Sequence, residues 1–363
     1  MLDRIEHIVG QSNIMTDMLF GFTQARSTSD GILVCRILQT LCKRNNVPLL
    51  MGFIDLEKAY DRVHRPTLWK TLKRIVISAA VVKIIEQFNV GSQAKVQALG
   101  EVSTSFPLNN GVKQGSVISP CLYNIFMGAI ITFAVNKMKI DGLGVKVMYQ
   151  QNERLFEEIH IELAEMRQIL AALFADDLVL FAQSSDHLQQ MIKSFTDTAN
   201  AFGQKVSSSK TEVMASTFGH LEQKAPKLEI LLNQNGTVNI LKQVKVFKYL
   251  GSRLTEDGEM DVEIGIRRNR MWEAYHKYAE TIYLNPHIPL WNKLLLFTTS
   301  VIPQATYGCA AWIYEPKHLF QLEVTQLQIL GKFMKPQGLK TLDMHTARGI
   351  AFRHHWKSLL PIA

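Results

Sequence analysis

The fold of this chain is decided by one stretch, Leu173-Phe174-Ala175-Asp176-Asp177-Leu178-Val179-Leu180-Phe181. Two adjacent aspartates stand between two short apolar runs, residues 171–175 and 178–181. Runs of this length predict two buried strands joined by a tight Asp-Asp turn. Unpaired carboxylates beside so much apolar surface repel each other and are costly to desolvate, so a hard divalent cation is their natural neutraliser. The alternative is an exposed hairpin turn, because aspartate is a common turn residue.

Composition sets wide bounds on the class of protein. The 363 residues carry 40 Lys and Arg against 32 Asp and Glu, which gives a formal net charge of +8 and a pI near 9.2. The length is sufficient for a sizeable core and for two domains or more. A polyanionic partner is compatible with this charge. A moderately basic protein without such a partner is the alternative, because a pI does not say where the charge lies.

Cysteine usage and hydropathy indicate a compartment. Cys35, Cys42, Cys121 and Cys309 are scattered, with no C-x-x-C pair and no Cys/His cluster, so neither a zinc site nor a disulfide framework is supported. Residues 1–10 contain several charged residues, which argues against a signal peptide. The longest apolar run, near residues 128–135, is too short to span a bilayer. We expect an intracellular protein of the cytoplasm or nucleus with no membrane partner.

A second acidic strand end lies far from the first in sequence. Residues 48–54 are a continuous apolar run of strand length that ends at Asp55. Helical spacing of apolar residues predicts helices over 31–43, 59–74, 76–90, 120–137 and 185–202, with Ser119 as N-cap of the fourth. A hairpin is expected at Gly100-Glu101, and the segment 150–168 is ambiguous between strand and helix. From residue 256 the chain turns mostly helical, so a domain boundary is expected there.

The two acidic strand ends suggest one site. If the strands are neighbours in a sheet, Asp55, Asp176 and Asp177 converge on one edge. Three carboxylates can hold two metal ions about 3.5–4 Å apart, the geometry used for in-line displacement at phosphorus. Such a site requires no general base with a shifted pKa.

Five motifs in a fixed order carry a family resemblance. They are FIDLEKAYD at 53–61, GVKQG at 111–115 followed by Ser119-Pro120, FADD at 174–177, Lys210-Thr211, and FKYLGS at 247–252. Together they resemble the motifs of reverse transcriptases. Their amino-acid sequences are most similar to the motifs in reverse transcriptases of non-LTR (LINE-like) retrotransposons. The resemblance runs roughly from Gly21 to Trp312. Each motif alone is a weak signal, whereas five in order are specific.

The resemblance implies both a fold and an activity. The fold is α+β, a right-hand polymerase with an antiparallel palm sheet, in which residues 1–255 form fingers and palm and residues 256–363 a helical thumb-like and C-terminal region. The activity is that of an RNA-directed DNA polymerase, which transfers a nucleotide from a deoxynucleoside triphosphate to a primer 3′-hydroxyl on an RNA template. Two Mg²⁺ ions are implied, with Mn²⁺ as a substitute. The alternative is a decayed or co-opted polymerase fold that binds nucleic acid without catalysis.

Roles for individual residues follow from the same resemblance. Asp55 and Asp176 would be the bridging metal ligands, and Asp177 a supporting ligand. Tyr60 resembles the aromatic that lies under the incoming sugar and excludes a 2′-hydroxyl, against the alternative of a core aromatic on a helix face. Nucleotide binding is implied for Lys113, Gln114, Gly115, Lys210 and Arg26, and nucleic-acid binding for Tyr249, Leu250, Gly251, Arg267, Arg268 and Arg270. For the basic residues, a solvated surface position is the alternative.

The chain also departs from the family pattern. Ser116 stands where a cysteine is common, and Ser208 where asparagine is frequent. No fingers motif of the Trp-Arg-x-Ile-Ser-Leu kind precedes Gly21, and neither an endonuclease domain nor a Cys/His zinc knuckle is present. We therefore expect a piece of a longer element protein, with impaired primer extension.

Overall fold

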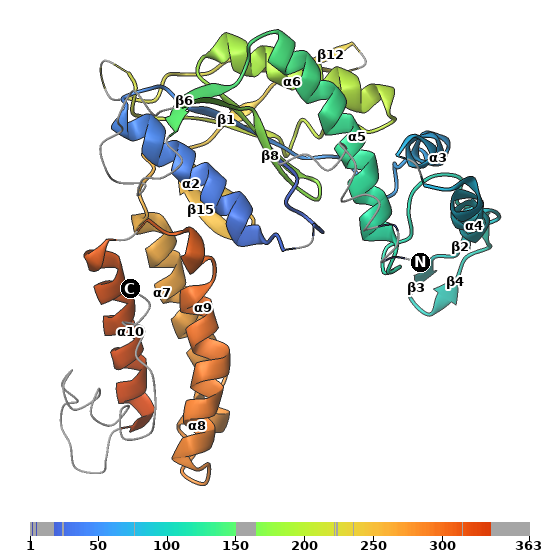
Figure 1. The fold of residues 1–363 in the computed structure, drawn as a ribbon. Coiled ribbons are helices and arrows are strands. Elements are labelled where there is room, and N and C mark those ends of the chain that lie inside the picture. Colours follow the sequence, from blue (N-terminus) through green and yellow to red (C-terminus); the bar gives the residue numbers. More distant parts are fainter. Residues whose placement is uncertain are drawn as a thin grey trace. The chain divides into compact units, whose positions relative to one another are not determined.

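The chain folds as two compact units in a computed structural model, residues 1–250 and 251–363 (Figure 1). The structure describes residues 2, 5, 18–23, 25–75, 77–149, 165–220, 222, 224–234, 236–313 and 315–334. The sequence placed its boundary a few residues later, between 255 and 256. The assignment of these parts as fingers and palm and as a thumb-like region stays a prediction.

The first unit is built on a five-stranded sheet in the order β13-β10-β1-β9-β8. Its strands are β1 (Leu50–Ile54), β8 (Ala171–Phe174), β9 (Asp177–Ala182), β10 (Glu212–Ala215) and β13 (Lys242–Gln243). The central strand β1 pairs antiparallel with both β9 and β10, whereas β13 joins β10 in parallel. The strands predicted from the apolar runs at 48–54, 171–175 and 178–181 are confirmed, and β1 is buried along its whole length.

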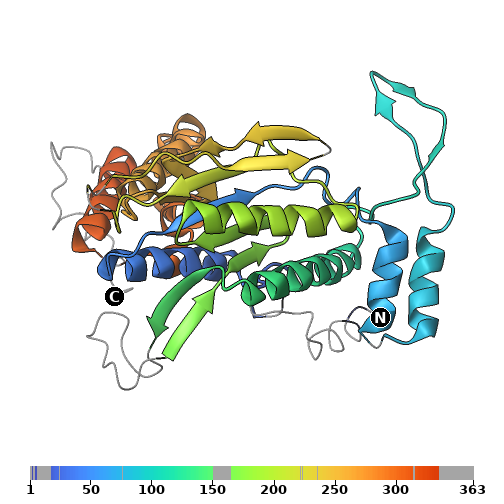
Figure 2. The same cartoon turned by 90° about the horizontal axis from the view of Figure 1, so that it is seen from above.

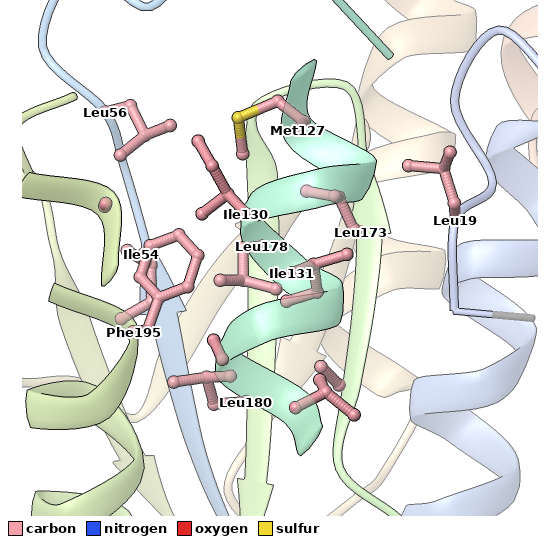
Figure 3. Packing of buried hydrophobic residues seen from close by; sticks show 14 of the residues in the cluster. Leu19, Ile54, Leu56, Met127, Ile130, Ile131, Leu173, Leu178, Leu180 and Phe195 are labelled. Atoms are coloured by element: carbon pink, nitrogen blue, oxygen red, sulfur yellow. The ribbon is translucent and has the colours of Figure 1, made fainter. Parts of the chain in front are cut away.

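One face of the sheet is covered by two helices, α5 (Ser119–Ile140) and α6 (Ser185–Ala201). A Cβ added at Gly52 of β1 would lie 3.1 Å from Leu188 of α6, so the missing side chain lets this helix pack close to the central strand. Figure 3 shows Ile130 and Ile131 of α5 packed against Leu178, together with neighbouring leucines of β8 and β9. The main core of the first unit therefore lies between the sheet and these helices.

The opposite face of β1 carries aromatic contacts. Successive residues of a strand point to opposite faces, so Phe53 faces away from α5 and α6. Its ring stacks on Phe247 of β14 (Val246–Tyr249) with centroids 3.8 Å apart, and the Tyr249 ring lies 6.3 Å away. The strand that leads to Asp55 is therefore fixed from both sides.

Helix α5 is apolar on nearly every side. By length and composition alone it could cross a membrane, which the sequence prediction had discounted from a shorter apolar run. In the structure 78% of its most apolar window is buried inside the protein. A helix with little amphipathicity is expected at the centre of a core, and this burial fits that position.

Three further helices belong to the first unit, with one correction to the sequence prediction. They are α2 (Thr28–Arg44), α3 (Arg65–Arg74) and α4 (Ala79–Asn89). The helix predicted from residue 59 begins only at Arg65, because residues 57–62 form turns, with Lys58 at φ 48°. Backbone hydrogen bonds from Gly111 and Val112 to the carbonyls of Val63 and Tyr60 hold this segment in place of helical bonds. Helix α5 begins at Ser119, and its N-cap is Ile118 instead.

Short strands complete the first unit. The hairpin predicted near Gly100 is confirmed, and it consists of β2 (Gln93–Ala94), β3 (Gln97–Ala98), β4 (Glu101–Val102) and β5 (Phe106–Pro107). Two further ribbons pair β6 (Val145–Tyr149) with β7 (Glu165–Ile169), and β11 (Leu231–Gln234) with β12 (Thr237–Ile240). Of the ambiguous segment 150–168, residues 165–168 belong to β7 and the rest lies outside the described residues.

The second unit is mostly helical, as the sequence predicted. After β15 (Ser252–Thr255) come α7 (Asp261–His276), α8 (Leu290–Leu296), α9 (Ile302–Thr306) and α10 (Pro316–Met334), with short helices at Ala279–Tyr283, Phe297–Val301 and Cys309–Ala311. Ile264, Met271, Phe297 and Ile329 are fully buried in its core. This unit thus has an apolar core of its own.

Candidate active site

The acidic hairpin differs in one detail from its prediction. Phe174 of β8 pairs with Asp177 of β9, so only Ala175 and Asp176 form the turn. Asp177 is therefore the first residue of β9, and the predicted Asp-Asp turn is corrected to an Ala-Asp turn. Ala175 has φ 56°, a conformation that is uncommon for residues other than glycine.

The strained turn is held by contacts from distant parts of the chain. Leu19 forms a parallel bridge with Leu173, and Phe20 donates its backbone N–H to the Leu173 carbonyl at 2.8 Å. At Gly21 an added Cβ would lie 2.3 Å from the Ala175 backbone nitrogen, so only glycine fits beside the turn. Asn124, buried in the apolar helix α5, donates its Nδ2 to the Gly21 carbonyl at 2.5 Å. The sequence interpretation missed Asn124, although an amide amid apolar residues was a signal for it.

The three aspartates meet at one end of the sheet. Because Ile54 is paired with Leu178, the next positions, Asp55 and Asp177, lie beside each other where β1 ends and β9 begins. The backbone of Asp55 is fixed on both sides: its N–H donates to Thr211 Oγ1 at 3.3 Å, and its carbonyl accepts from the Ser207 N–H at 2.8 Å. The segment 207–211 therefore positions Asp55.

Burial and mutual repulsion perturb this acidic group. Asp177 is exposed as a residue, yet reduced hydration of its carboxyl and the charges of Asp176 and Asp55 raise its pKa to about 6. For Asp55, loss of hydration is the largest effect and raises the pKa; the charge of Lys210 opposes this effect, and that of Asp176 adds to it. Negative charge is therefore costly here.

The donor set fits a hard cation. Asp55 Oδ2 is buried and has no hydrogen-bond partner among the described residues, and Lys210 Nζ lies 3.6 Å from it. In the described part of the chain no three His, Cys, Asp or Glu side chains are already gathered as a closed metal site. Neighbouring carboxylates that repel one another nevertheless supply the oxygen ligands that Mg²⁺-type ions prefer. Reverse transcriptases in general use divalent metal ions.

Tyr60 lies in a turn segment and not on a helix face, yet it packs against the main core, so both of its predicted roles stay predictions. Its half-buried ring stacks on that of Tyr123 of α5, with centroids 4.4 Å apart and planes 15° from parallel. Loss of hydration, and then the charge of Asp176, raises the pKa of Tyr60. Tyr123 is fully buried, and its hydroxyl has no hydrogen-bond partner among the described residues. The Tyr60 ring is thus held in place by the Tyr123 ring and lies within the electric field of the acidic hairpin.

The GVKQG loop, residues 111–115, lies against the Tyr60 segment. Lys113, Gln114 and Gly115 are exposed, and a Cβ at Gly115 would meet open space, so its φ of 82° is what favours glycine there. At Gly111 a Cβ would lie 2.9 Å from the backbone of Asp61, so there close approach excludes a side chain.

Two predicted nucleic-acid contacts are corrected. Tyr249 is 1% exposed, so its ring belongs to the core of the first unit. Arg267 is 0% exposed and forms an ion pair with the equally buried Glu263. Its Nη2 also donates to the Gly251 carbonyl at 2.8 Å, and its guanidinium lies 4.9 Å from the Tyr307 ring centroid. A side chain held inside its unit in this way cannot reach a polyanion.

The other predicted contacts to nucleotide or nucleic acid are at least partly exposed or make contacts with nearby residues. Arg268 is half-buried and donates its Nε to Thr325 Oγ1 at 3.0 Å, and Arg270 is half-exposed. Arg26 is exposed, with its guanidinium 5.0 Å from the Phe20 ring centroid. Leu250 and Gly251 both have positive φ, 47° and 83°. The nucleic-acid roles of these residues stay predictions.

The fold and the acidic site define a polymerase-type palm, and the comparison with family models agrees. Residues 1–254 match the model of the reverse transcriptase (RNA-dependent DNA polymerase) family. This match covers well over half of the 363 residues, and the chain belongs to that family.

Relatives among curated proteins come from non-LTR retrotransposons. The Pol polyprotein of the type-2 retrotransposable element R2DM of Drosophila melanogaster is 26% identical over 290 residues, which is 77% of this chain and 25% of that protein. The RNA-directed DNA polymerase from the mobile element jockey of Drosophila funebris is 24% identical over 300 residues, 80% of this chain and 29% of the relative. The chain thus spans between a quarter and a third of the length of these two relatives.

A solved structure shares the fold. The telomerase from Candida albicans, in complex with a fragment of telomeric RNA, matches 98% of this chain and 58% of its own with a TM-score of 0.51 and 11% identity. Identity this low supports the right-hand polymerase fold alone.

Proposed function

We propose that this chain is an RNA-directed DNA polymerase, which extends a DNA primer with deoxynucleoside triphosphates on an RNA template. One observation carries the proposal. Asp55 and Asp177 lie beside each other where β1 ends and β9 begins, with Asp176 next to them, and burial and the charge of Asp176 raise the pKa of Asp55. The matching family model and the non-LTR relatives support the same activity. We place its action inside the cell, in the cytoplasm or nucleus, where such templates lie.

The carboxylates have distinct roles in this proposal. Asp55 and Asp176 would hold two Mg²⁺ ions, for which Mn²⁺ can substitute, and Asp177 would support them from the start of β9. Bound divalent ions lower the barrier to attack by a primer hydroxyl and stabilise the leaving pyrophosphate. The Asp55 backbone donates to Thr211 Oγ1 and accepts from the Ser207 N–H, and these bonds, with the packing of Gly21 against Ala175, keep the carboxylates in place.

Neighbouring residues would select and orient the nucleotide. Tyr60, backed by the buried Tyr123 ring, would exclude a 2′-hydroxyl by its volume. Lys113, Gln114 and Gly115 would contact the nucleotide and template from an exposed loop. Lys210, whose side chain is 70% exposed, would leave Asp55 for the triphosphate when a cation takes its place.

A second candidate function has one observation in its favour. Lys210 already neutralises part of the acidic group, and among the described residues no closed metal site is gathered. These facts suit a fold that binds nucleic acid without catalysis. The three aspartates at one sheet end favour the polymerase, because binding phosphate does not need them.

Primer extension distinguishes the two candidates. The parent chain and Asp55→Asn are compared on a primed RNA template and a primed DNA template with Mg²⁺, alongside a binding titration. The polymerase proposal expects Mg²⁺-dependent extension by the parent, loss of it in Asp55→Asn, and unimpaired binding in both. Tight binding with no extension by the parent would establish the second candidate instead.

A further inference from the structure

Arg65 makes an unusual set of contacts. It is the first residue of α3, and its guanidinium donates to the backbone carbonyls of three separate segments. Nε donates to Gly111 at 2.8 Å, and Nη1 donates to Asn89 at 2.9 Å and to Leu108 at 2.7 Å. The guanidinium supplies several donors in a fixed plane, which one lysine ammonium does not reproduce.

Two of these carbonyls lie at the base of a projecting arm, residues 90–107, which contains β2 to β5. Asn89 ends α4 just before the arm, and Leu108 follows it. A backbone bond from the Leu108 N–H to the Ser92 carbonyl closes the base. Figure 2 shows the arm, in cyan, extending away from α3 and α4. At its tip Leu99 is fully exposed, so within the first unit the arm is anchored through its base.

The third carbonyl belongs to the GVKQG loop. Gly111 opens this loop and donates its N–H to the Val63 carbonyl at 2.9 Å, and Val112 donates to the Tyr60 carbonyl at 3.0 Å. Arg65 therefore holds the loop from one side while the Tyr60 segment holds it from the other. Its bond to Gly111 connects the arm base to the loop in a single side chain.

We infer that Arg65 is a positioning residue for the nucleotide site, which sets the GVKQG loop against Tyr60 and links the loop to the base of the arm. The inference rests on the proposed function for its kinetic consequence only. The loop lies beside the proposed sugar site, so its displacement weakens nucleotide binding before it affects the carboxylates. We therefore expect a rise in KM for the nucleotide with a smaller change in kcat.

The surroundings of Arg65 permit a chemical rescue. A cavity of about 310 Å³ lies beside it, lined also by Trp69, Glu86 and Pro107. Truncation of Arg65 to alanine enlarges this space by the volume of the side chain. Added ethylguanidinium has room to occupy it and to donate to the same carbonyls.

The experiment compares Arg65→Ala, Arg65→Lys and, as a matched control, Arg74→Ala, whose arginine is exposed at the other end of the same helix. Amide hydrogen exchange is measured for Gly111 and Val112, whose N–H groups are hydrogen-bonded in the loop. We expect about tenfold faster exchange in both Arg65 variants, as for the loss of a charged hydrogen bond. The control should be unchanged, and ethylguanidinium should restore protection in Arg65→Ala.

In a second measurement, KM and kcat for the nucleotide are determined by primer extension. We expect KM to rise about tenfold in the Arg65 variants, with kcat within about threefold, and to recover with ethylguanidinium in Arg65→Ala. Unchanged exchange at Gly111 and Val112, or faster exchange spread equally over α2 and α5, would overturn the inference. If Arg65→Ala does not fold, Arg65→Lys decides by the same readouts. A parent without extension overturns the proposed function, and the exchange data then decide the inference alone.

Discussion

Two groups of charged residues in this molecule differ in whether their charges are paired. In the second unit, Glu263 and Arg267 are almost completely buried, and each has the other as its partner. Glu263 Oε2 also accepts the Arg253 N–H at 2.7 Å. In the first unit, Asp55, Asp176 and Asp177 carry charge of one sign, and the exposed Lys210, with its Nζ 3.6 Å from Asp55 Oδ2, offsets only part of that charge.

The difference separates a structural role from a ligand-binding one. A buried pair whose charges cancel needs no further partner, and its removal leaves one charge without compensation. The charge of Asp176 raises the pKa of both Asp55 and Asp177, so this group keeps an excess of negative charge that a divalent cation would neutralise. From sequence alone Arg267 had been assigned to nucleic-acid binding, and the three aspartates to metal binding. The pairing of the charges, not their presence, distinguishes them.

The largest expected effect is on catalysis at the acidic group. Asp176→Asn should lower primer extension by about 10³-fold, because metal activation of the attacking hydroxyl is lost. Affinity for primer-template should stay within a few-fold, since the phosphate contacts remain. Extension rates and binding titrations are measured side by side. Extension by Asp176→Asn at a rate near that of the parent would show that Asp176 is not a metal ligand.

Substitution in the buried Glu263–Arg267 pair should lower the stability of the second unit and leave catalysis to the acidic group. Arg267→Met leaves Glu263 buried without its partner and should destabilise the second unit by about 3–5 kcal/mol. Thermal or denaturant unfolding measures this loss. The salt dependence of nucleic-acid binding should not change, whereas Arg270→Glu should lower its slope if Arg270 contacts phosphate. A stable Arg267→Met variant whose nucleic-acid binding depends less steeply on salt would show that Arg267 contacts nucleic acid after all.

Sugar selection should depend on the volume of Tyr60. Tyr60→Ala should raise ribonucleotide relative to deoxyribonucleotide incorporation by about 10–100-fold, as expected when a steric contact is removed from a pocket. Tyr60→Phe keeps the ring and serves as the control. The same ratio in all three proteins would make Tyr60 a packing residue for Tyr123.

The smallest effect is a pH dependence of stability. The pKa of Asp177 is raised from 3.8 to about 6, so between about pH 4 and pH 6 the folded state binds more protons than the unfolded state. Stability should therefore fall as pH rises through this window and stay lower above it. Asp177→Asn should raise Tm at pH 7 by about 1–3 °C after solvent screening, and by less at pH 4. Mg²⁺ should raise the parent's Tm at pH 7 more than that of the variant. Equal Tm values for parent and variant at both pH values would show that repulsion at Asp177 does not destabilise the fold.

Much of the site was predictable because its signals are local. An apolar run of strand length with an aspartate at one end predicts a buried strand with a charge at that end: Asp55 follows β1, and Asp177 opens β9. That the two strands would be neighbours was a hypothesis, and the register of Ile54 with Leu178 supplies the evidence.

The parts that sequence did not predict depend on contacts between distant segments. Residues 59–62 belong to the segment with helical spacing, yet bonds from Gly111 and Val112 hold them as turns. Arg267 lies on a helix whose pattern gives no sign that it is buried, and only the partner Glu263 explains its position. The link between Arg65 and three carbonyls likewise joins segments that are remote in the chain.

The most direct test of the account counts divalent ions at the acidic group. Mn²⁺ binding is followed by electron paramagnetic resonance in the presence of a chain-terminated primer on RNA template and the matching nucleotide, for the parent, Asp55→Asn and the control Arg74→Ala. The account predicts two bound ions in the parent and the control at pH 8, fewer at pH 5 as carboxylates protonate, and one or none in Asp55→Asn. Equal numbers of bound ions in the parent and Asp55→Asn would contradict it.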